Sequence, residues 1–140
     1  MRAIDKYYIA KEIVACYFKK KGFNACFLPK VVKDCGNGAH AHLSIWKDKQ
    51  NHMGNINGKY GLSEDANHFM AGILKHLCAL VHFMCPSANS LRRIKPNGFC
   101  GAYRYWGREN REAPMKLVTP IRPGDPVTNF ELKSFDNTSN

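Results

Sequence analysis

The chain has 140 residues, which is enough for one modest domain with a hydrophobic core. Its apolar content of 44% and aromatic content of 11% are typical of folded proteins and argue against a disordered chain. The sequence has no apolar run of about 18 residues, and its first residues lack the apolar segment of a signal peptide. We therefore expect a cytoplasmic protein with no membrane partner.

The formal net charge of +10 comes mostly from scattered Lys and Arg residues. The only basic run, residues 19–21, ends a predicted helix, where cations interact favourably with the helix dipole. Anionic substrates, or acidic segments missing from the chain, are alternative explanations of the charge. A nucleic-acid-binding module is a further hypothesis, but neither zinc-finger spacing nor an aromatic stacking platform accompanies the charge, so we expect no nucleic-acid partner.

The six cysteines form no C-x-x-C pair. Without a signal peptide, we expect reduced and mostly buried thiols.

In chain order, the first predicted element is a helix over residues 5–20, with apolar positions at helical spacing and Gly22 as its stop. Residues 24–28 predict a short strand closed by Pro29. A loop containing Gly36 and Gly38 leads into a strand that ends near Trp46. Residues 47–61 are polar and rich in glycine, which predicts a surface hairpin or flap.

Ser63 is a good N-cap for a helix that runs to about Met84, where Pro86 stops it. An apolar stripe marks the buried face of this helix: Phe69, Ile73, Leu77, Leu80, Val81 and Met84. The remainder predicts short strands over residues 102–106, 115–119 and 129–135. Helices packed against a curved, largely antiparallel sheet give an α+β fold class.

The strand after the glycine loop carries polar side chains on one face. Because side chains alternate across a strand, His40, His42 and Ser44 point one way, while Ala41 and Leu43 point into the core. Imidazoles and a hydroxyl beside a glycine-rich loop are typical of a metal-and-phosphate site.

Three dense clusters follow in the second half, over residues 89–93, 106–114 and 129–136. Together with the loop-and-strand motif of residues 36–44 and the start of the long helix at residues 61–72, in this order, they resemble the catalytic domain of glutamine synthetase. The amino-acid sequence of residues 101–114 is most similar to a plant and fungal branch of the family, in which a synthetase-like domain is fused to an amidohydrolase-like domain.

The resemblance implies an ATP-dependent ligase. In that family, ATP phosphorylates the side-chain carboxylate of glutamate, and ammonia or an amine displaces the phosphate. It implies Mg²⁺ or Mn²⁺ bound by His40 and Glu131, and Arg111 as the residue that meets the transferred phosphate. The residues implied to contact ATP are His42, Ser44, Arg111 and Lys116. Those implied to contact glutamate are Gly36, Arg93 and Lys133.

The chain departs from the family pattern at several positions. Cys35 replaces an asparagine of the family pattern. Lys116 and Lys133 replace arginines, so the positive charge is kept but the two parallel N–H donors of a guanidinium are lost. No carboxylate lies between Arg93 and Glu109, around Phe99, where the family carries a flap glutamate. Two alternatives therefore stay open: a ligase for a different amine, and a degenerate, non-catalytic domain for oligomerisation or signalling.

The resemblance spans the whole chain, residues 1–140, but only part of the family's catalytic domain. The N-terminal β-grasp domain, the upstream metal-binding strands and the C-terminal helices have no counterpart here. We therefore expect a fragment that is inactive and poorly soluble by itself, and a homo-oligomer when full length.

Overall fold

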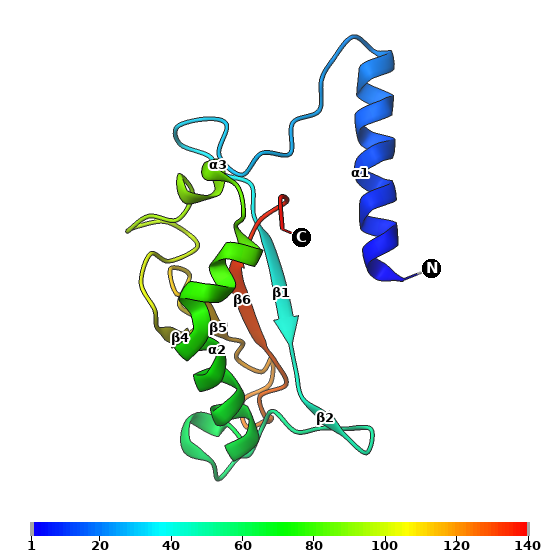
Figure 1. Ribbon diagram of the computed structural model, residues 1–140. Coiled ribbons are helices and arrows are strands. Elements are labelled where there is room, and N and C mark those ends of the chain that lie inside the picture. The colour runs from blue at the N-terminus through cyan, green and yellow to red at the C-terminus, as the bar shows by residue number, and fades with distance from the viewer. Residues whose placement is uncertain (1, 140) are drawn as a thin grey trace.

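The computed structural model describes residues 2–139, in which short strands occur both before and after a central group of helices (Figure 1). The helices are α1 (Ala3–Lys20), the 3₁₀ turn η1 (Lys59–Gly61), α2 (Glu64–Met84) and α3 (Ala88–Leu91). The strands are β1 (Ala39–Leu43), β2 (Trp46–Lys47), β3 (Gln50–Asn51), β4 (Trp106–Arg108), β5 (Met115–Leu117) and β6 (Phe130–Phe135).

Four strands form the main sheet in the order β1-β6-β5-β4. Its β1–β6 and β6–β5 pairs are antiparallel, and β5 pairs with β4 in parallel. Strand β6 is the longest, and the register places Glu131 opposite His42 on one side and Lys116 on the other. The predicted α+β class with a largely antiparallel sheet is confirmed.

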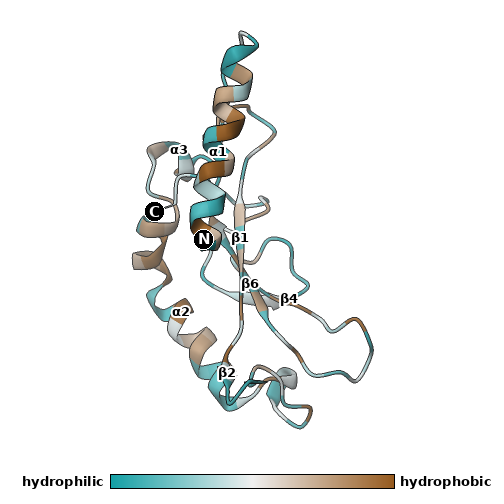
Figure 2. Cartoon of the chain, turned by 90° about the vertical axis from the view of Figure 1, so that its right-hand side faces the viewer, coloured by the Kyte–Doolittle hydropathy of each residue, from teal (hydrophilic) through white to brown (hydrophobic). Residues whose placement is uncertain are grey.

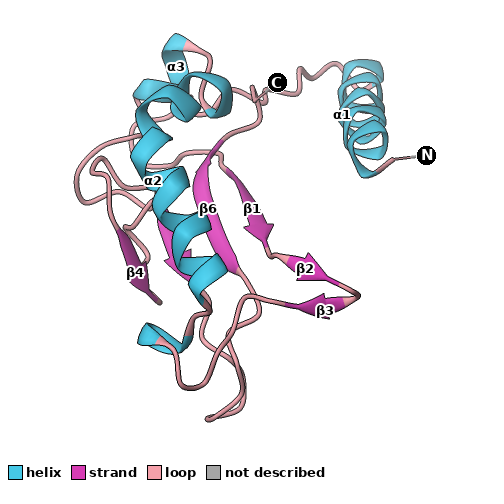
Figure 3. Cartoon of the chain, turned by 60° about the horizontal axis from the view of Figure 1, so that its bottom comes forward, coloured by secondary structure: helices cyan, strands magenta, loops and turns pink. Residues whose placement is uncertain are grey.

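Helix α2 covers one face of this sheet (Figures 1 and 3). The Ser63 hydroxyl accepts a hydrogen bond from the amide of Ala66 at 3.0 Å, and Glu64 and Asp65 occupy the first turn, so the predicted N-cap is confirmed. The helix ends at Met84, before Pro86, as predicted. Its buried residues are Ala66, Met70, Leu77 and Met84.

The predicted apolar stripe of α2 is partly correct, because Leu77 and Met84 are buried as predicted but two other buried residues were not in it. Ala66 and Met70 are buried, while Phe69 is 38% exposed and packs edge-on against Phe130 with ring centroids 5.6 Å apart. The core joins this helix to β5 and β6, whose Met115, Leu117 and Phe130 are fully buried.

The predicted alternation along β1 is confirmed. His40 and His42 are exposed on one face, and Ala39, Ala41 and Leu43 are half-buried on the other. Ala39 pairs with Phe135 and Ala41 with Leu132. Strand β6 therefore has one extra residue opposite His40, which is a β-bulge on β6.

Helix α1 was predicted at almost its observed position, but no residue on it is buried. Its apolar side chains, which include Ile9, Ile13 and Tyr17, are exposed. Figure 2 shows apolar residues along this helix, and Figures 1 and 3 show that it stands apart from the sheet. Two hydrogen bonds join it to the opposite end of the chain. They run from the Tyr7 hydroxyl to Asn137 Oδ1 at 2.7 Å, and from Lys11 Nζ to the Asn137 carbonyl at 2.8 Å.

Two strand predictions were wrong. Residues 24–28 form no strand in the described structure, because no neighbouring segment supplies the backbone hydrogen bonds that a strand needs. The strand predicted at 102–106 begins only at Trp106, where the pairing with β5 starts. The hairpin predicted within residues 47–61 is present as β2–β3.

The expectation of mostly buried cysteines was also wrong. All six thiols are free, but only Cys85 and Cys100 are buried. Cys16 is exposed because it lies on the uncovered helix α1, and Cys26 because it lies on the unpaired segment after that helix. None of the helices within residues 2–139 has the length and apolar character needed to cross a membrane.

The connection between β4 and β5 is unusually short for parallel strands. Residues 109–114 form the whole link, whereas parallel neighbours normally need a crossover of about a dozen residues or more. Asn110 Oδ1 accepts hydrogen bonds from the amides of Glu112 and Ala113 at 2.9 and 3.0 Å. Glu109 Oε1 accepts one from the amide of Thr119 at 2.7 Å, which holds the pKa of Glu109 below its usual value.

We predict that Phe130→Ala lowers the free energy of unfolding by about 3–5 kcal/mol, because it opens a cavity beneath α2. Phe83→Ala on α2 is the matched control, since Phe83 is 69% exposed, and its effect should stay within about 0.5 kcal/mol. Urea denaturation followed by circular dichroism measures both. Equal losses in the two variants would contradict this account of the core.

Candidate functional site

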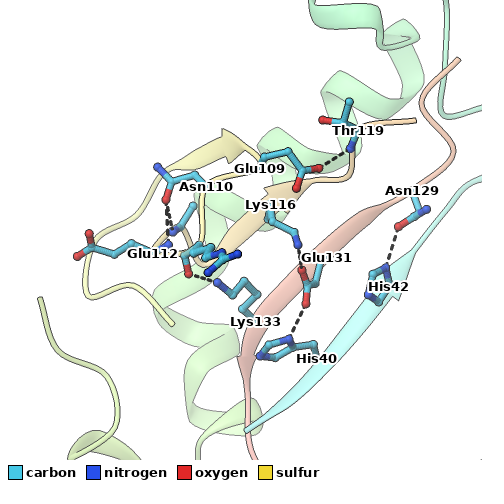
Figure 4. Close-up of polar contacts among 12 residues, drawn as sticks. His40, His42, Glu109, Asn110, Glu112, Lys116, Thr119, Asn129, Glu131 and Lys133 are labelled. Carbon is cyan, nitrogen blue, oxygen red and sulfur yellow. Dashed lines mark hydrogen bonds and ion pairs between the residues drawn. The ribbon is translucent and has the colours of Figure 1, made fainter. Parts of the chain in front are cut away.

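Three charged or titratable side chains meet on the face of the sheet opposite α2 (Figure 4). His40 Nδ1 lies 2.5 Å from Glu131 Oε1, and Lys116 Nζ lies 2.6 Å from Glu131 Oε2. The sheet register explains the meeting, because β1, β6 and β5 are adjacent and each supplies one side chain. Sequence analysis placed His40 and Glu131 in a metal site and Lys116 beside ATP, and the structure brings the three into direct contact.

Glu131 is a nearly buried carboxylate, with 7% of its surface exposed. Burial by itself raises the pKa of a carboxyl group. Here the hydrogen bonds with Lys116 and His40 together outweigh burial, so the pKa of Glu131 is lowered and the group stays ionised at neutral pH.

Lys133 lies two residues along β6 and is 4% exposed. Its ammonium group donates a hydrogen bond to the backbone carbonyl of Arg111, which ties the β4–β5 loop to the central strand. Burial lowers the pKa of Lys133, and the positive charges of Lys116 and Arg111 lower it further against the opposing effect of Glu131. The side chain of Arg111 itself is exposed.

His42 and Ser44, the predicted ATP contacts, make separate hydrogen bonds farther along β1 and just beyond it. His42 Nδ1 pairs with Asn129 Oδ1 at 2.8 Å (Figure 4), and Ser44 Oγ accepts from the indole of Trp46 at 2.8 Å. The sequence assigned no role to Asn129. Its place at the head of the 129–136 cluster, one residue before a strand that pairs with β1, was the available signal.

The predicted glutamate-binding residues Gly36 and Arg93 line a second feature, a cleft of about 390 Å³ that His40 also lines. His40 therefore belongs to both groups and links the carboxylate cluster to the cleft. Other lining residues had no predicted role: Lys30, Asp34, Gly38, Lys95, Asn97, Gly98 and Cys100. Exposed Phe99 also lines the cleft.

The cleft carries an excess of positive charge. Lys30, Arg93 and Lys95 line it, against a single carboxylate, Asp34, among its lining residues. Such a lining suits an anionic ligand.

The donor set fits part of a site for a divalent cation. An imidazole nitrogen and a carboxylate oxygen in mutual contact are ligands that Mg²⁺ and Mn²⁺ accept. Within residues 2–139, however, no cluster of three or more His, Cys, Asp or Glu side chains could hold a metal ion. His40 and Glu131 can therefore supply two ligands, and the remaining positions would need water, substrate or other protein groups.

Comparison with known proteins places the chain in one family. The family described as "Glutamine synthetase, catalytic domain" matches residues 1–140. The γ-glutamylpolyamine synthetase GlnA3 of Streptomyces coelicolor is 34% identical over 99% of this chain. The type-1 glutamine synthetase 1 of Dictyostelium discoideum is 34% identical over all of it. The chain spans 30% and 29% of the lengths of these two relatives.

Solved structures show the same fold. The cryo-EM structure of Plasmodium falciparum glutamine synthetase aligns with a TM-score of 0.81 and 29% identity, covering 94% of this chain and 26% of the other. A crystal structure described as a novel glutamine synthase homolog aligns with a TM-score of 0.78 and 31% identity, covering 98% of this chain and 34% of the other.

We predict that Lys116→Met raises the pKa of Glu131, because the variant removes the cation that stabilises the carboxylate. A carboxyl group whose folded pKa is depressed stabilises the fold above its unfolded pKa of about 4.3, and this contribution is lost as the pH falls through the lower folded value. In the variant, less stability should therefore be lost on acidification. Urea unfolding between about pH 5 and pH 3 measures this. Lys47→Met, at an exposed position on β2, is the control, and the same change in both variants would contradict the pairing.

Proposed function

The chain belongs to the glutamine synthetase family, and from this premise we propose that it forms part of the active site of an ATP-dependent ligase that joins the γ-carboxyl group of glutamate to ammonia or another amine. The observation that carries the proposal is the contact of His40 with Glu131 and of Glu131 with Lys116, at the edge of a cationic cleft lined by Arg93. This arrangement supports the proposal, because an imidazole and a carboxylate that could ligate a metal ion lie beside a cationic cleft that suits an anion.

In this proposal, His40 and Glu131 hold Mg²⁺ or Mn²⁺ beside the bound phosphates. Such an ion would neutralise charge on the phosphate oxygens and so assist in-line transfer of the γ-phosphoryl group from ATP to the glutamate carboxylate, with ADP as the leaving group. The lowered pKa of Glu131 keeps the carboxylate ionised and ready to bind a cation. Lys116 lies against the other carboxylate oxygen, so it orients Glu131 and places a positive charge near the transferred phosphate.

The cleft binds the glutamate substrate. Arg93 presents its guanidinium to a carboxylate of the glutamate substrate. The backbone of Gly36 packs against the Arg93 side chain, and a Cβ at Gly36 would come 3.3 Å from Arg93 Cγ. Lys133 reinforces the positive potential from within the sheet. His42, Ser44 and Arg111 are assigned to ATP, and Arg111 stabilises the charge that develops on the transferred phosphoryl group.

The adjacent strands β1, β6 and β5 bring His40, Glu131 and Lys116 together, but the chain spans less than a third of the first relatives' length. Turnover is therefore proposed for the full-length protein, with further groups from outside the described residues completing the site. Assembly into a homo-oligomer belongs to the same proposal.

We predict that His40→Ala and Arg111→Ala in the full-length protein each reduce glutamate- and ATP-dependent phosphate release by at least about 100-fold, because each removes a group that stabilises transition-state charge. His68→Ala, at an exposed position on α2, is the matched histidine control and should keep activity. Unchanged turnover in either site variant would refute these residue assignments.

Nucleotide binding can be measured separately from turnover. Mg²⁺-ATP at about 100 times its Kd should stabilise the unmodified protein by about 2.7 kcal/mol, seen as a higher midpoint of thermal unfolding. Absence of any such stabilisation would favour the non-catalytic alternative.

A second candidate acceptor is an amine larger than ammonia. It is supported by Phe99, which is 78% exposed and lines the cleft in a stretch without a carboxylate. One of the relatives is by name a γ-glutamylpolyamine synthetase. An apolar side chain at this position suits the methylene groups of a polyamine better than an ammonium ion.

We predict that Phe99→Glu shifts the ratio of kcat/KM for ammonium over putrescine upward by about tenfold or more, because a carboxylate can bind and deprotonate ammonium. Ile121→Glu introduces the same charge at a fully exposed position and should leave the ratio unchanged. An unmodified protein that uses ammonium alone would refute the larger acceptor.

A further inference from the structure

Arg93 is held by the end of strand β6. Its NH2 group donates a hydrogen bond to the Phe135 carbonyl at 2.6 Å and lies 3.8 Å from the sulfur of Cys85. On its other side, a Cβ added at Gly38 would come within 2.9 Å of the NH1 group. The guanidinium therefore occupies a narrow space between β6 and the glycine loop, at the wall of the cleft.

A buried acid follows directly on the residue that holds Arg93. Asp136 is 1% exposed, and its Oδ1 accepts hydrogen bonds from the amide and hydroxyl of Thr138 at 2.8 and 2.5 Å. Its Oδ2 has no hydrogen-bond partner among residues 2–139, and the same is true of the buried Nε of Arg93. Burial by itself would raise the pKa of Asp136, but its hydrogen bonds, chiefly those from Thr138, outweigh burial and lower it. A carboxylate charge therefore persists in this buried place, with Oδ2 still available to act on neighbouring groups.

Cys85 lies between the two charged groups. Its thiol donates to the Ser134 carbonyl at 2.5 Å, touches Arg93 and interacts with the Asp136 carboxylate. Burial and the negative charge of Asp136 raise the pKa of Cys85 to about 11, so the group between them is a neutral thiol. A neutral, polarisable side chain separates the acid from the guanidinium without cancelling either charge.

We propose that Asp136, acting through Cys85 and the adjoining end of β6, is a positioning residue for Arg93 that holds its guanidinium with NH1 toward the cleft. The inference rests on the proposed function, in which Arg93 binds glutamate. Asp136 touches no substrate in this scheme. Its buried negative charge favours the guanidinium at the Phe135 carbonyl over a position in solvent, so the arginine is already oriented before glutamate binds.

The test is a double-mutant cycle in the full-length protein. Asp136→Asn should raise the KM for glutamate about tenfold, while kcat changes less than about threefold and stabilisation by Mg²⁺-ATP is retained. In a protein that already carries Arg93→Lys, Asp136→Asn should raise KM by less than about twofold, because the group it positions is gone. Asp48→Asn, at an exposed turn residue with φ of 48°, a conformation that asparagine adopts readily, is the matched control.

Two results would overturn the inference: an unchanged KM in Asp136→Asn, or an equal increase with and without Arg93. If Asp136→Asn does not fold, Cys85→Val and Cys85→Ser replace it. Valine should raise the KM because it removes the polar link, and serine should restore it. Equal KM values for the two would refute the role.

Failure of the proposed function gives a different result. In that case the unmodified protein would show no glutamate-dependent turnover at all. The position of Arg93 is then decided by crystal structures of the unmodified protein and of Asp136→Asn. A guanidinium displaced from the Phe135 carbonyl only in the variant supports the inference, and an unmoved one refutes it.

Discussion

The position of strand β6 is the constraint on which the site depends. It is the only strand of the described sheet that pairs on both sides with strands bearing site residues, β1 and β5. Its register aligns Glu131 between them, and its carbonyl at Phe135 holds Arg93. Because side chains alternate along a strand, Phe130 and Leu132 enter the core under α2 from the same strand that presents Glu131 on the opposite face. The packing of the core and the geometry of the site are thus set by one element.

The site combines charges of both signs at close range, and two of them, Glu131 and Lys133, are buried. Glu131 is surrounded by His40 and Lys116, and Lys133 lies two residues further along the same strand. A buried charge is destabilising unless an opposite charge lies next to it. Loss of one cation therefore raises the pKa of the neighbouring carboxylate. The β-bulge on β6, opposite His40, adds a local bend to the central strand beside the contact of His40 with Glu131.

Much of the fold could be predicted from local signals. Helix α2 has a capping serine, acidic residues in its first turn and a proline stop, and β1 has a clean alternation of histidines with small apolar residues. The exposure of α1 could not be predicted, since its apolar spacing indicates a buried face and nothing in the chain says what covers it. The parallel pairing of β4 with β5 also escaped prediction, because short strands joined by a short loop normally form a hairpin.

For the site, the ordered motifs gave the residue types, and the sheet register gave the contacts. The interaction of Lys116 with Glu131 depends on two strands being neighbours, which no spacing within the sequence reveals. The same holds for Asn129 with His42. Lys30, Asp34 and Lys95 come to the cleft from loops, where neither alternation nor helical spacing applies, so their place was not predictable. Asp136 was visible in a motif, but its burial beside Cys85 was not.

The short connection between β4 and β5 restricts the conformations that Arg111, near its middle, can adopt. Residues on a long loop lose considerable conformational entropy when a ligand immobilises them. Here the link consists of residues 109–114 alone. The Asn110 side chain accepts two hydrogen bonds from amides within the link, and Lys133 on β6 donates one to the Arg111 carbonyl. These contacts restrain the backbone around Arg111, so a ligand bound by this side chain would cost mainly the entropy of the side-chain torsions. A residue that belongs to a loop by its place in the chain thus has the preorganisation of a residue on the sheet.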